Sequence, residues 1–253
     1  MKSALAIIPA RYASTRFPGK PLVKIGGKTM IQRVFEQTKK AGNIERVVVA
    51  TDDERIADEV YSFGGEVVMT SVSCVSGTDR CAEAFEKSQS DAQIIINVQG
   101  DEPFIDPRQI EELVALMNKT HADIGTLCQK TVSEEAIFNP NVVKLVKSTT
   151  GKALYFSRST IPFVRGENEK LWKEKAPYFR HLGMYAYTSK VLLEISKLQP
   201  GQLELAENLE QLRWLEAGYN IYVAENELET IGIDSPQDLL LAEEFLRKSK
   251  DFQ

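Results

Sequence analysis

Residues 4–20 read ALAIIPARYASTRFPGK, an apolar run followed directly by a cation-rich turn. The apolar part, residues 4–9, predicts a strand buried on both faces, because apolar and polar side chains do not alternate in it. The turn after it contains small residues and three cations, Arg11, Arg16 and Lys20. Ligands of parallel sheets bind at the carboxyl ends of the strands. The residues that follow each predicted strand are therefore the first place to look for function.

Apolar strands alternate with amphipathic helices through the first half of the chain. Further strands are predicted at 47–50, 67–70 and 94–99, and helices at 30–41, 54–63, 80–87 and 107–118. Short continuous apolar strands that alternate with helices are typical of a parallel sheet covered on both faces. The sequence therefore predicts an α/β fold, with a mostly parallel sheet flanked by helices.

The middle of the chain has a different pattern, with more strands. Strands are predicted at 123–129, 142–147, 153–156, 184–188 and 221–224, helices at 191–198, 206–217 and 237–247, and a charged surface loop at 165–175. We expect this β-richer section to be partly antiparallel. Because no linker, repeat or low-complexity segment interrupts the sequence, we expect a single domain, residues 1–253, with an elaborated section at 123–188.

Composition and charge exclude several classes of protein. Of the 253 residues, 43% are hydrophobic, which is enough for a substantial core, and no apolar run is long enough to predict a membrane span. The net charge is −5, yet the first 35 residues contain seven cations and no carboxylate. An acidic chain is a poor candidate for binding a nucleic acid polymer, whereas its basic N-terminal part suits one small anion.

The basic N-terminal part and the cysteines bear on location. A basic, acid-free N-terminus also occurs in transit peptides, but Pro9, Pro18 and Pro21 would break an amphipathic helix there. The three cysteines are an odd number without metal-ligand spacing. They predict no disulfide framework and a cytoplasmic location.

The turn at residues 10–20 has the composition of an anion site. It lacks the glycine spacings of a Walker A loop and of a dinucleotide fingerprint. Its small residues would let backbone N–H groups approach an anion, and its cations would offset negative charge, which is what a polyphosphate requires. A basic surface loop would have the same composition, so both interpretations stay open at this point.

Two aspartates follow later apolar stretches. Asp101 lies in VQGDEP at 98–103, and Asp234 lies in GIDSP at 232–236. Both are candidate Mg²⁺ ligands, because Mg²⁺ takes one or two carboxylates together with substrate phosphates. Gly100 would allow a ligand to approach the backbone closely. Each aspartate also has a structural interpretation, Asp101 as a turn or cap residue and Asp234 as part of a helix start.

Two further features have both a structural and a functional interpretation. In SGTDR at 76–80, the hydroxyls would cap a helix, or Arg80 would face a phosphate. His181, one of two histidines, would serve as a structural hydrogen-bond donor or lie at a binding site. The sequence contains no Cys/His cluster that would predict a zinc site. It also contains no Gly-x-Ser-x-Gly motif that would predict a hydrolase.

Several motifs together resemble one enzyme family. IIPARYASTRFPGKPL at 7–22 resembles the opening of the sugar-acid cytidylyltransferases. Five further motifs resemble the branch of that family that uses 3-deoxy-D-manno-octulosonate (Kdo). They are SGTDR at 76–80, NVQGDEP at 97–103, ALYFSRSTIP at 153–162, RHLG at 180–183 and LEQLR at 209–213. The resemblance covers about residues 4–246. It implies a nucleotidyltransferase fold of the glycosyltransferase-A type.

The resemblance also implies an activity and its partners. CMP would be transferred from CTP to Kdo, releasing pyrophosphate, with Mg²⁺ as cofactor. The CMP-Kdo product would serve lipopolysaccharide biosynthesis. The enzyme would be a cytoplasmic homodimer.

Residue roles follow from the resemblance, position by position. Nucleotide-binding roles are implied for Ala10, Arg11, Ser14, Lys20, Ser76, Gly77, Arg80, Gln99 and Asp101. Asp101 and Asp234 would hold the metal and, with Lys20 and Arg11, would be catalytic. Sugar-binding roles are implied for Arg158, His181, Tyr185, Glu210 and Gln211.

Some residues depart from the family pattern, and other functions stay open. Cys74 and Val75 stand where relatives often have polar residues, residues 228–230 replace a common Pro-Gly-Thr-like run, and Asp79 replaces a glutamate. The alternatives are an N-acylneuraminate cytidylyltransferase, a sugar-1-phosphate nucleotidyltransferase, or a non-catalytic nucleotide- or sugar-binding protein. The motifs at 180–183 and 209–213 argue against the first two, and the pair of aspartates argues against the third.

Overall fold

The computed structural model describes residues 2–13, 17–120, 122–131, 133–228, 232–233 and 235–249. The chain divides into two compact units, Met1–Val114 with Leu228–Gln253, and Ala115–Glu227. The section at 123–188, predicted to be an elaboration of one domain, lies wholly within the second unit.

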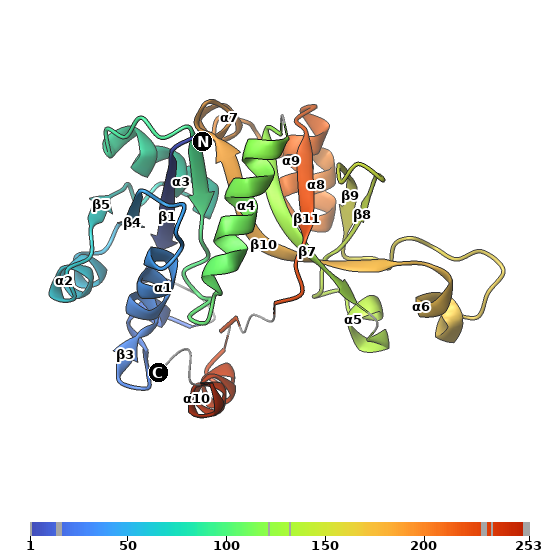
Figure 1. Ribbon diagram of the computed structural model, residues 1–253, viewed down its shortest axis with the longest axis horizontal. Helices are drawn as coiled ribbons and strands as arrows, with labels where there is room; N and C mark the ends of the chain where they lie inside the picture. Colours follow the sequence, from blue (N-terminus) through green and yellow to red (C-terminus); the bar gives the residue numbers. More distant parts are fainter. Residues whose placement is uncertain are drawn as a thin grey trace. The chain divides into compact units, whose positions relative to one another are not determined.

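A parallel sheet forms the centre of the first unit (Figure 1). β1 (Ala4–Ala10) pairs in parallel with β4 (Arg46–Thr51) on one side and β6 (Ile94–Asn97) on the other, and β4 pairs with β5 (Val67–Met69). Side chains of β1 and β6 are buried almost throughout, as expected for strands covered on both faces. The predicted parallel sheet is confirmed, with each strand within two residues of its expected bounds.

Helices flank this sheet at the positions that the periodicity predicts. They are α1 (Met30–Lys39), α2 (Glu54–Ser62), α3 (Gly77–Lys87), α4 (Pro107–Lys119) and α10 (Asp238–Lys248). The helix predicted at 80–87 begins three residues earlier. The reason is a capping box, in which Asp79 N donates to Ser76 Oγ and Ser76 N donates to Asp79 Oδ2, both at 3.1 Å.

A short hairpin between β1 and α1 has no counterpart among the predicted elements. It consists of the 3₁₀ turn Lys20–Leu22 followed by β2 (Lys24–Ile25) and β3 (Lys28–Thr29). Gly26 and Gly27 turn it with φ angles of 53° and 84°, a conformation that favours glycine. The strands are too short for their periodicity to reveal them, although the Gly-Gly pair is itself a hairpin signal.

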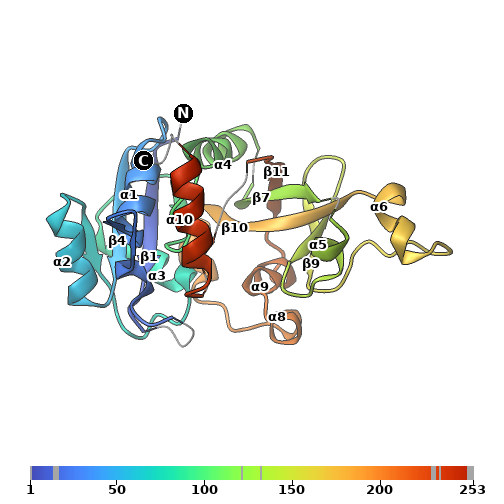
Figure 2. The ribbon, with the colours of Figure 1, turned by 90° about the horizontal axis from the view of Figure 1, so that it is seen from below.

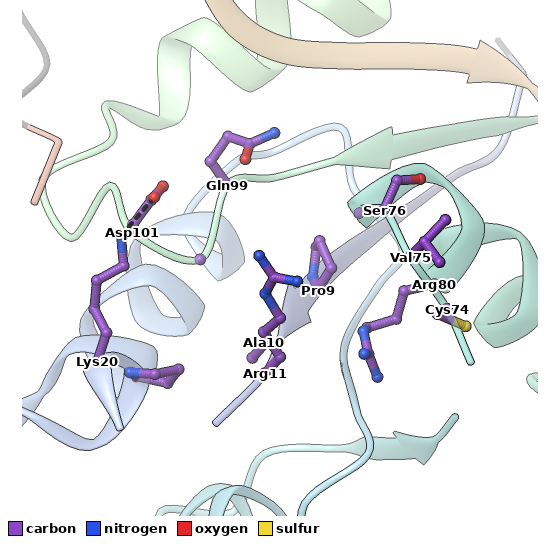
Figure 3. A pocket seen from close by; sticks show the side chains of 13 residues that line it. Pro9, Ala10, Arg11, Lys20, Cys74, Val75, Ser76, Arg80, Gln99 and Asp101 are labelled. Atoms are coloured by element: carbon purple, nitrogen blue, oxygen red, sulfur yellow. Dashed lines mark hydrogen bonds and ion pairs between the residues drawn. The ribbon is translucent and has the colours of Figure 1, made fainter. Parts of the chain in front are cut away.

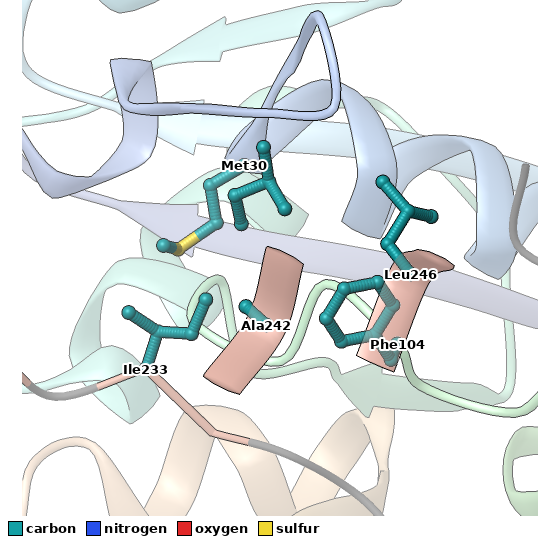
Figure 4. Packing of buried hydrophobic residues seen from close by; sticks show 6 residues of the cluster. Met30, Phe104, Ile233, Ala242 and Leu246 are labelled. Carbon is teal, nitrogen blue, oxygen red and sulfur yellow. The ribbon is translucent and has the colours of Figure 1, made fainter. Parts of the chain in front are cut away.

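The C-terminal helix packs back onto the N-terminal half of the chain. Ala242 and Leu246 of α10 join Met30, Phe104 and Ile233 in one buried cluster (Figure 4). Figure 2 shows α10 beside α1. This packing connects the segment before the last helix to the loop after β6.

The second unit has a mixed sheet, as predicted. β10 (Tyr178–Thr188) pairs antiparallel with β7 (Ile124–Thr131) and β8 (Lys144–Lys147), and β8 pairs antiparallel with β9 (Ala153–Ser157). β11 (Ile221–Glu225) runs parallel to β7. β10 begins six residues before the predicted strand at 184–188, because polar residues and a bulge obscure the periodicity of its first half.

The helices of the second unit correct two predictions. They are α5 (Glu134–Phe138), α6 (Trp172–Lys175), α7 (Ser189–Ile195), α8 (Gln202–Glu207) and α9 (Glu210–Glu216). The single helix predicted at 206–217 is wrong, because Asn208 adopts a left-handed φ of 51° and separates α8 from α9. The predicted loop at 165–175 contains α6, whose Trp172 is buried.

Candidate active site

A cavity of about 270 Å³ opens at the carboxyl ends of β1 and β6 in the first unit (Figure 3). Eight of the nine predicted nucleotide-binding residues line it, namely Ala10, Arg11, Lys20, Ser76, Gly77, Arg80, Gln99 and Asp101. The ninth, Ser14, lies outside the described residues, as does the predicted metal ligand Asp234. Strand ends, a 3₁₀ turn and a helix start thus bring together segments that are distant in sequence.

Lys20 and Asp101 form an ion pair at one side of the cavity (Figure 3). Lys20 Nζ donates to Asp101 Oδ2 at 2.8 Å and to the carbonyl oxygen of Ile233 at 2.6 Å. The backbone N–H of Ile233 in turn donates to the carbonyl oxygen of Asp101 at 3.0 Å. The loop after β6 and the segment before α10 are therefore joined at the predicted catalytic lysine.

Arg80 lies on the other side of the cavity, near the start of α3 (Figure 3). Its side chain is buried, and it donates to Thr70 Oγ1 at 2.6 Å and to Asp52 Oδ2 at 3.1 Å. Ser76 and Gly77 lie beside it at the helix N-terminus, where the helix dipole favours negative charge. This wall carries a fixed guanidinium whose charge is partly offset by Asp52.

The packing of the backbone requires glycine at position 100, which is a different reason from the predicted approach of a ligand. A Cβ atom built on Gly100 would lie 2.8 Å from the carbonyl oxygen of Pro9. The close approach that requires glycine is therefore between the loop after β6 and the backbone of β1. That Gly100 also lets a ligand approach the backbone stays a prediction, and both Pro9 and Gly100 line the cavity.

Cys74 lines the cavity as an un-ionised thiol. Burial and the hydrogen bond that its Sγ donates to Glu83 Oε2, at 3.0 Å, raise the pKa of Cys74 to about 11. Glu83 also accepts from the backbone N–H of Ser71 at 2.9 Å. The same carboxylate therefore holds both the thiol and the loop that carries it.

Predicted sugar-binding residues come together in the second unit. The ring centroid of His181 lies 5.3 Å from that of Tyr185 and 5.1 Å from that of Phe156. His181 Nε2 lies 2.9 Å from Thr126 Oγ1, whose hydroxyl donates to the carbonyl oxygen of Met184 at 2.8 Å. The imidazole and the hydroxyl of Thr126 therefore share one hydrogen bond, whose direction depends on the tautomer of the ring. Burial lowers the pKa of His181 to about 3, so the ring is neutral.

Tyr185 presents a buried hydroxyl that finds no hydrogen-bond partner among the described residues. Burial, together with nearby Tyr187 and Glu210, raises the pKa of Tyr185 well above its ordinary value. Glu210 is thus close to it, and the adjacent Gln211 is buried in the first turn of α9. A buried hydroxyl without a protein partner is typical of a group that binds a ligand or water.

Arg158, the fifth predicted sugar-binding residue, is bound to backbone. Its guanidinium donates to the carbonyl oxygens of Glu207 at 2.7 Å, Pro140 at 3.2 Å and Asn208 at 3.2 Å. These bonds connect the residue after β9 to the turn between α8 and α9 and to the segment before β8. Its role toward a sugar stays a prediction.

Several residues that shape the cavity were not found from the sequence. Asp52 and Thr70 hold Arg80, and Glu83 holds Cys74. Asp52 and Thr70 lie at or just after the ends of predicted strands, so the rule applied to Asp101 would have found them. Glu83 lies inside a helix, where the sequence carries no such signal.

Comparison with known proteins identifies the family. A family model described as "Cytidylyltransferase" matches residues 5–228. The chain belongs to the cytidylyltransferase family. Its resemblance to the sugar-acid members extends over nearly the whole sequence. A 3-deoxy-manno-octulosonate cytidylyltransferase of Cytophaga hutchinsonii is 53% identical over 94% of this chain and 95% of its own. A protein of the same name from Bacteroides thetaiotaomicron is 52% identical over 96% and 98%.

A solved structure extends the comparison to the fold. The structure of CMP:2-keto-3-deoxy-manno-octonic acid synthetase complexed with CTP matches with a TM-score of 0.90 and 43% identity, over 97% of this chain and 99% of the other. The predicted nucleotidyltransferase fold is confirmed. No helix within the part of the chain that the structure describes has the length and apolarity to cross a membrane.

Proposed function

We propose that this protein transfers CMP from CTP to Kdo and releases pyrophosphate. The cavity of the first unit carries the proposal, because it gathers the predicted nucleotide-binding residues around the Lys20–Asp101 pair. The relatives that match almost the full chain bear the name of this activity, and the matched solved structure is a complex with CTP.

Both substrates are anions, so the central difficulty of the reaction is electrostatic. The anomeric hydroxyl of Kdo attacks the α-phosphorus of CTP and loses its proton to solvent, the bond to the β-phosphate breaks, and pyrophosphate leaves with that bond's electron pair. Positioning and charge neutralisation are the main means by which proteins accelerate such transfers. Lys20 and Arg11, both at the cavity, would offset the charge that develops on the leaving pyrophosphate.

Asp101 suits the predicted Mg²⁺ ion. Its side chain is 34% exposed and presents hard carboxylate oxygens to the cavity, one of which Lys20 holds. No group of three or more possible metal ligands occurs among the described residues. Mg²⁺ needs only one or two carboxylates when substrate phosphates complete its ligands. Asp101, with Asp234 as the second predicted ligand, would hold the ion. Bound Mg²⁺ would supply positive charge at the α-phosphate and lower the pKa of the attacking hydroxyl.

The second unit would supply the groups that recognise the sugar. The unpartnered hydroxyl of Tyr185 and the neutral imidazole of His181 are suited to hydrogen bonds with sugar hydroxyls. Glu210 adds a carboxylate near Tyr185, and the buried Gln211 follows it in the first turn of α9. Recognition by such groups would reject sugars that leave them unpaired.

We also propose a homodimer in the cytoplasm. Phe138, Phe163 and Leu171 are exposed, by 38%, 72% and 40%, around the buried Trp172, with ring centroids of Phe163 and Trp172 4.9 Å apart. Adjacent exposed apolar side chains suit a protein interface. Sedimentation that shows only monomer at micromolar concentration would refute the dimer.

The free thiol of Cys74 suits a reducing compartment.

One assay tests the activity. Pyrophosphate release is measured with CTP and Kdo, with and without Mg²⁺, and with N-acetylneuraminate in place of Kdo or UTP and ATP in place of CTP. We expect release only with CTP, Kdo and Mg²⁺ together. Preferential use of N-acetylneuraminate would move the protein to a different branch of the family. Equal rates with all nucleotides would contradict cytidylyl transfer, and no release from folded protein would contradict catalysis.

A further inference from the structure

The ring of Tyr12 contacts two other segments at the base of the predicted triphosphate loop. Arg55 Cζ lies 3.3 Å from the centroid of the ring. A Cβ atom built on Gly19 would lie 3.2 Å from ring atoms of Tyr12, so the backbone of Gly19 packs against the same ring. The N–H of Gly19 also donates to the carbonyl oxygen of Tyr12 at 2.9 Å. Tyr12 therefore connects α2 to the far end of the loop.

Arg55 is itself fixed in orientation. Its Nε donates to Asp53 Oδ1 at 2.9 Å and its Nη2 donates to Asp53 Oδ2 at 2.7 Å, while Asp53 caps α2. These paired bonds set the plane of the guanidinium. A guanidinium held over the face of a tyrosine ring is attracted by the ring's electrons, so the loop gains a second anchor besides its own backbone bond.

The stack acts on the residue from which the catalytic lysine begins. Gly19 has a φ of 71°, in the left-handed region, and directly precedes Lys20. Lys20 Nζ reaches Asp101 Oδ2 at 2.8 Å. A shift of Gly19 would therefore move the ammonium group of Lys20 relative to Asp101 and to a bound triphosphate, which would weaken its charge-assisted hydrogen bonds to CTP.

We propose that Tyr12 and Arg55 are positioning residues that hold Gly19, and through it Lys20, in place for the binding of CTP. Neither residue is among the described residues that line the cavity, so their effect passes through Gly19 and Lys20. The effect on CTP rests on the proposed function. The anchoring of the loop itself rests on the contacts alone.

Four variants separate the ring, the cation and the hydroxyl. Tyr12→Leu and Arg55→Ala remove the stack and should raise the KM for CTP about fivefold, with the KM for Kdo unchanged. Tyr12→Phe keeps the ring and should behave as wild type. In the double variant Tyr12→Leu/Arg55→Ala, the KM for CTP should rise no more than in the single variant with the larger increase, because the two residues act as one unit.

Arg108→Ala is the matched control. Arg108 makes the same bonds to Asp106 at the start of α4, with Nε at 2.9 Å and Nη2 at 2.6 Å, and its removal changes the net charge equally. We expect its KM for CTP to equal that of wild type. If Arg108→Ala raises this KM as much as Arg55→Ala does, the effect is one of net charge and the proposal fails.

Hydrogen exchange provides a readout that does not need turnover. The amide of Gly19 should exchange at least about tenfold faster in Tyr12→Leu and Arg55→Ala, but not in Tyr12→Phe or Arg108→Ala. Unchanged exchange in the first two, in proteins with wild-type melting temperatures, would overturn the proposal. If wild type does not turn over CTP and Kdo, the proposed function fails, and the exchange experiment still decides whether the stack anchors the loop.

Discussion

Lys20 Nζ lies 2.8 Å from Asp101 Oδ2, although the two residues are 81 positions apart in the sequence. The pair joins the loop after β1 to the loop after β6. Lys20, the predicted phosphate-binding cation, thus contacts Asp101, the predicted metal ligand. A change at either residue also removes the ion-pair partner of the other. Two predictions for activity follow.

Replacing Asp101 by asparagine should remove most turnover while the fold survives. The amide side chain would keep the shape and one oxygen acceptor for Lys20, but it would lose the negative charge that suits Mg²⁺. We expect kcat to fall by about two to three orders of magnitude with little change in melting temperature. Asp106→Asn, which removes a carboxylate that caps α4, is the control and should affect stability only. Near-normal activity in folded Asp101→Asn would end the assignment.

Replacing Lys20 by methionine should weaken the site for pyrophosphate. The variant keeps the aliphatic stem but removes the ammonium group that donates to Asp101 and to Ile233. In the reverse reaction, from CMP-Kdo, the KM for pyrophosphate should rise about tenfold or more, because a charge-assisted hydrogen bond is lost. Lys24→Met, at an exposed position of β2, should leave this KM unchanged. Equal effects of the two variants would contradict a specific role for Lys20.

The thiol of Cys74 should resist alkylation at neutral pH. With its pKa raised to about 11, from an ordinary 9.0, the thiolate fraction at pH 8 is about a hundredfold smaller than in an unperturbed cysteine. Iodoacetamide labelling followed by peptide mapping should show slow modification that accelerates toward pH 11. Glu83→Gln keeps an oxygen acceptor for the thiol but removes a negative charge beside it, so it should lower the pKa of Cys74 and speed labelling at pH 8. Rapid labelling of wild type at pH 7 would contradict the buried hydrogen bond.

His181 should make the folded protein sensitive to acid. Its pKa is about 3 in the folded state against an ordinary 6.5, so between these pH values the unfolded chain binds a proton that the folded chain does not. The free energy of unfolding therefore rises with pH in that window and falls on acidification, by at most about 1.4 kcal/mol per pH unit from this group. Urea unfolding at pH 6.5 and 4.5 measures the loss. In His181→Gln the loss should be smaller by about 2 kcal/mol, whereas identical losses would mean that the ring titrates normally.

Gly100→Ala should destabilise the first unit. The added Cβ would lie 2.8 Å from the carbonyl oxygen of Pro9, and neither backbone can move without disturbing a buried strand. We expect the free energy of unfolding to fall by about 1–3 kcal/mol. Gly183→Ala is the control, because a Cβ at that position meets nothing within 4 Å. A stability equal to wild type in Gly100→Ala would show that β1 and the loop after β6 accommodate the methyl group.

The first unit was predicted well because local pattern decides its elements. The apolar run of β1 and the amphipathic repeat of α1 each show their class within ten residues, and parallel strands bring their carboxyl ends to one edge. That geometry allowed the cavity to be inferred from residues that follow strands. The pairing of Lys20 with Asp101 was beyond such reasoning, since no local pattern specifies which loops meet.

The second unit was predicted less well because its boundaries depend on single residues. The break at Asn208 turns one predicted helix into two, and nothing in the apolar repeat of 206–217 reveals it. The first half of β10 contains Arg180 and His181, whose polar side chains hide the strand. The roles of His181 and Tyr185 came from the family resemblance, while the neutral state of the ring and the unpartnered hydroxyl depend on burial that only the three-dimensional structure shows.

The connection between β4 and α2 is two residues long, and both of them bind an arginine. Asp52 holds Arg80 at the cavity wall, and Asp53 holds Arg55 against Tyr12. Adjacent residues of an extended chain point in opposite directions, so one dipeptide serves two separate parts of the site. Inserting or deleting a single residue there would leave at least one guanidinium without its carboxylate. This connection should therefore tolerate no change of length, unlike most surface loops between a strand and a helix.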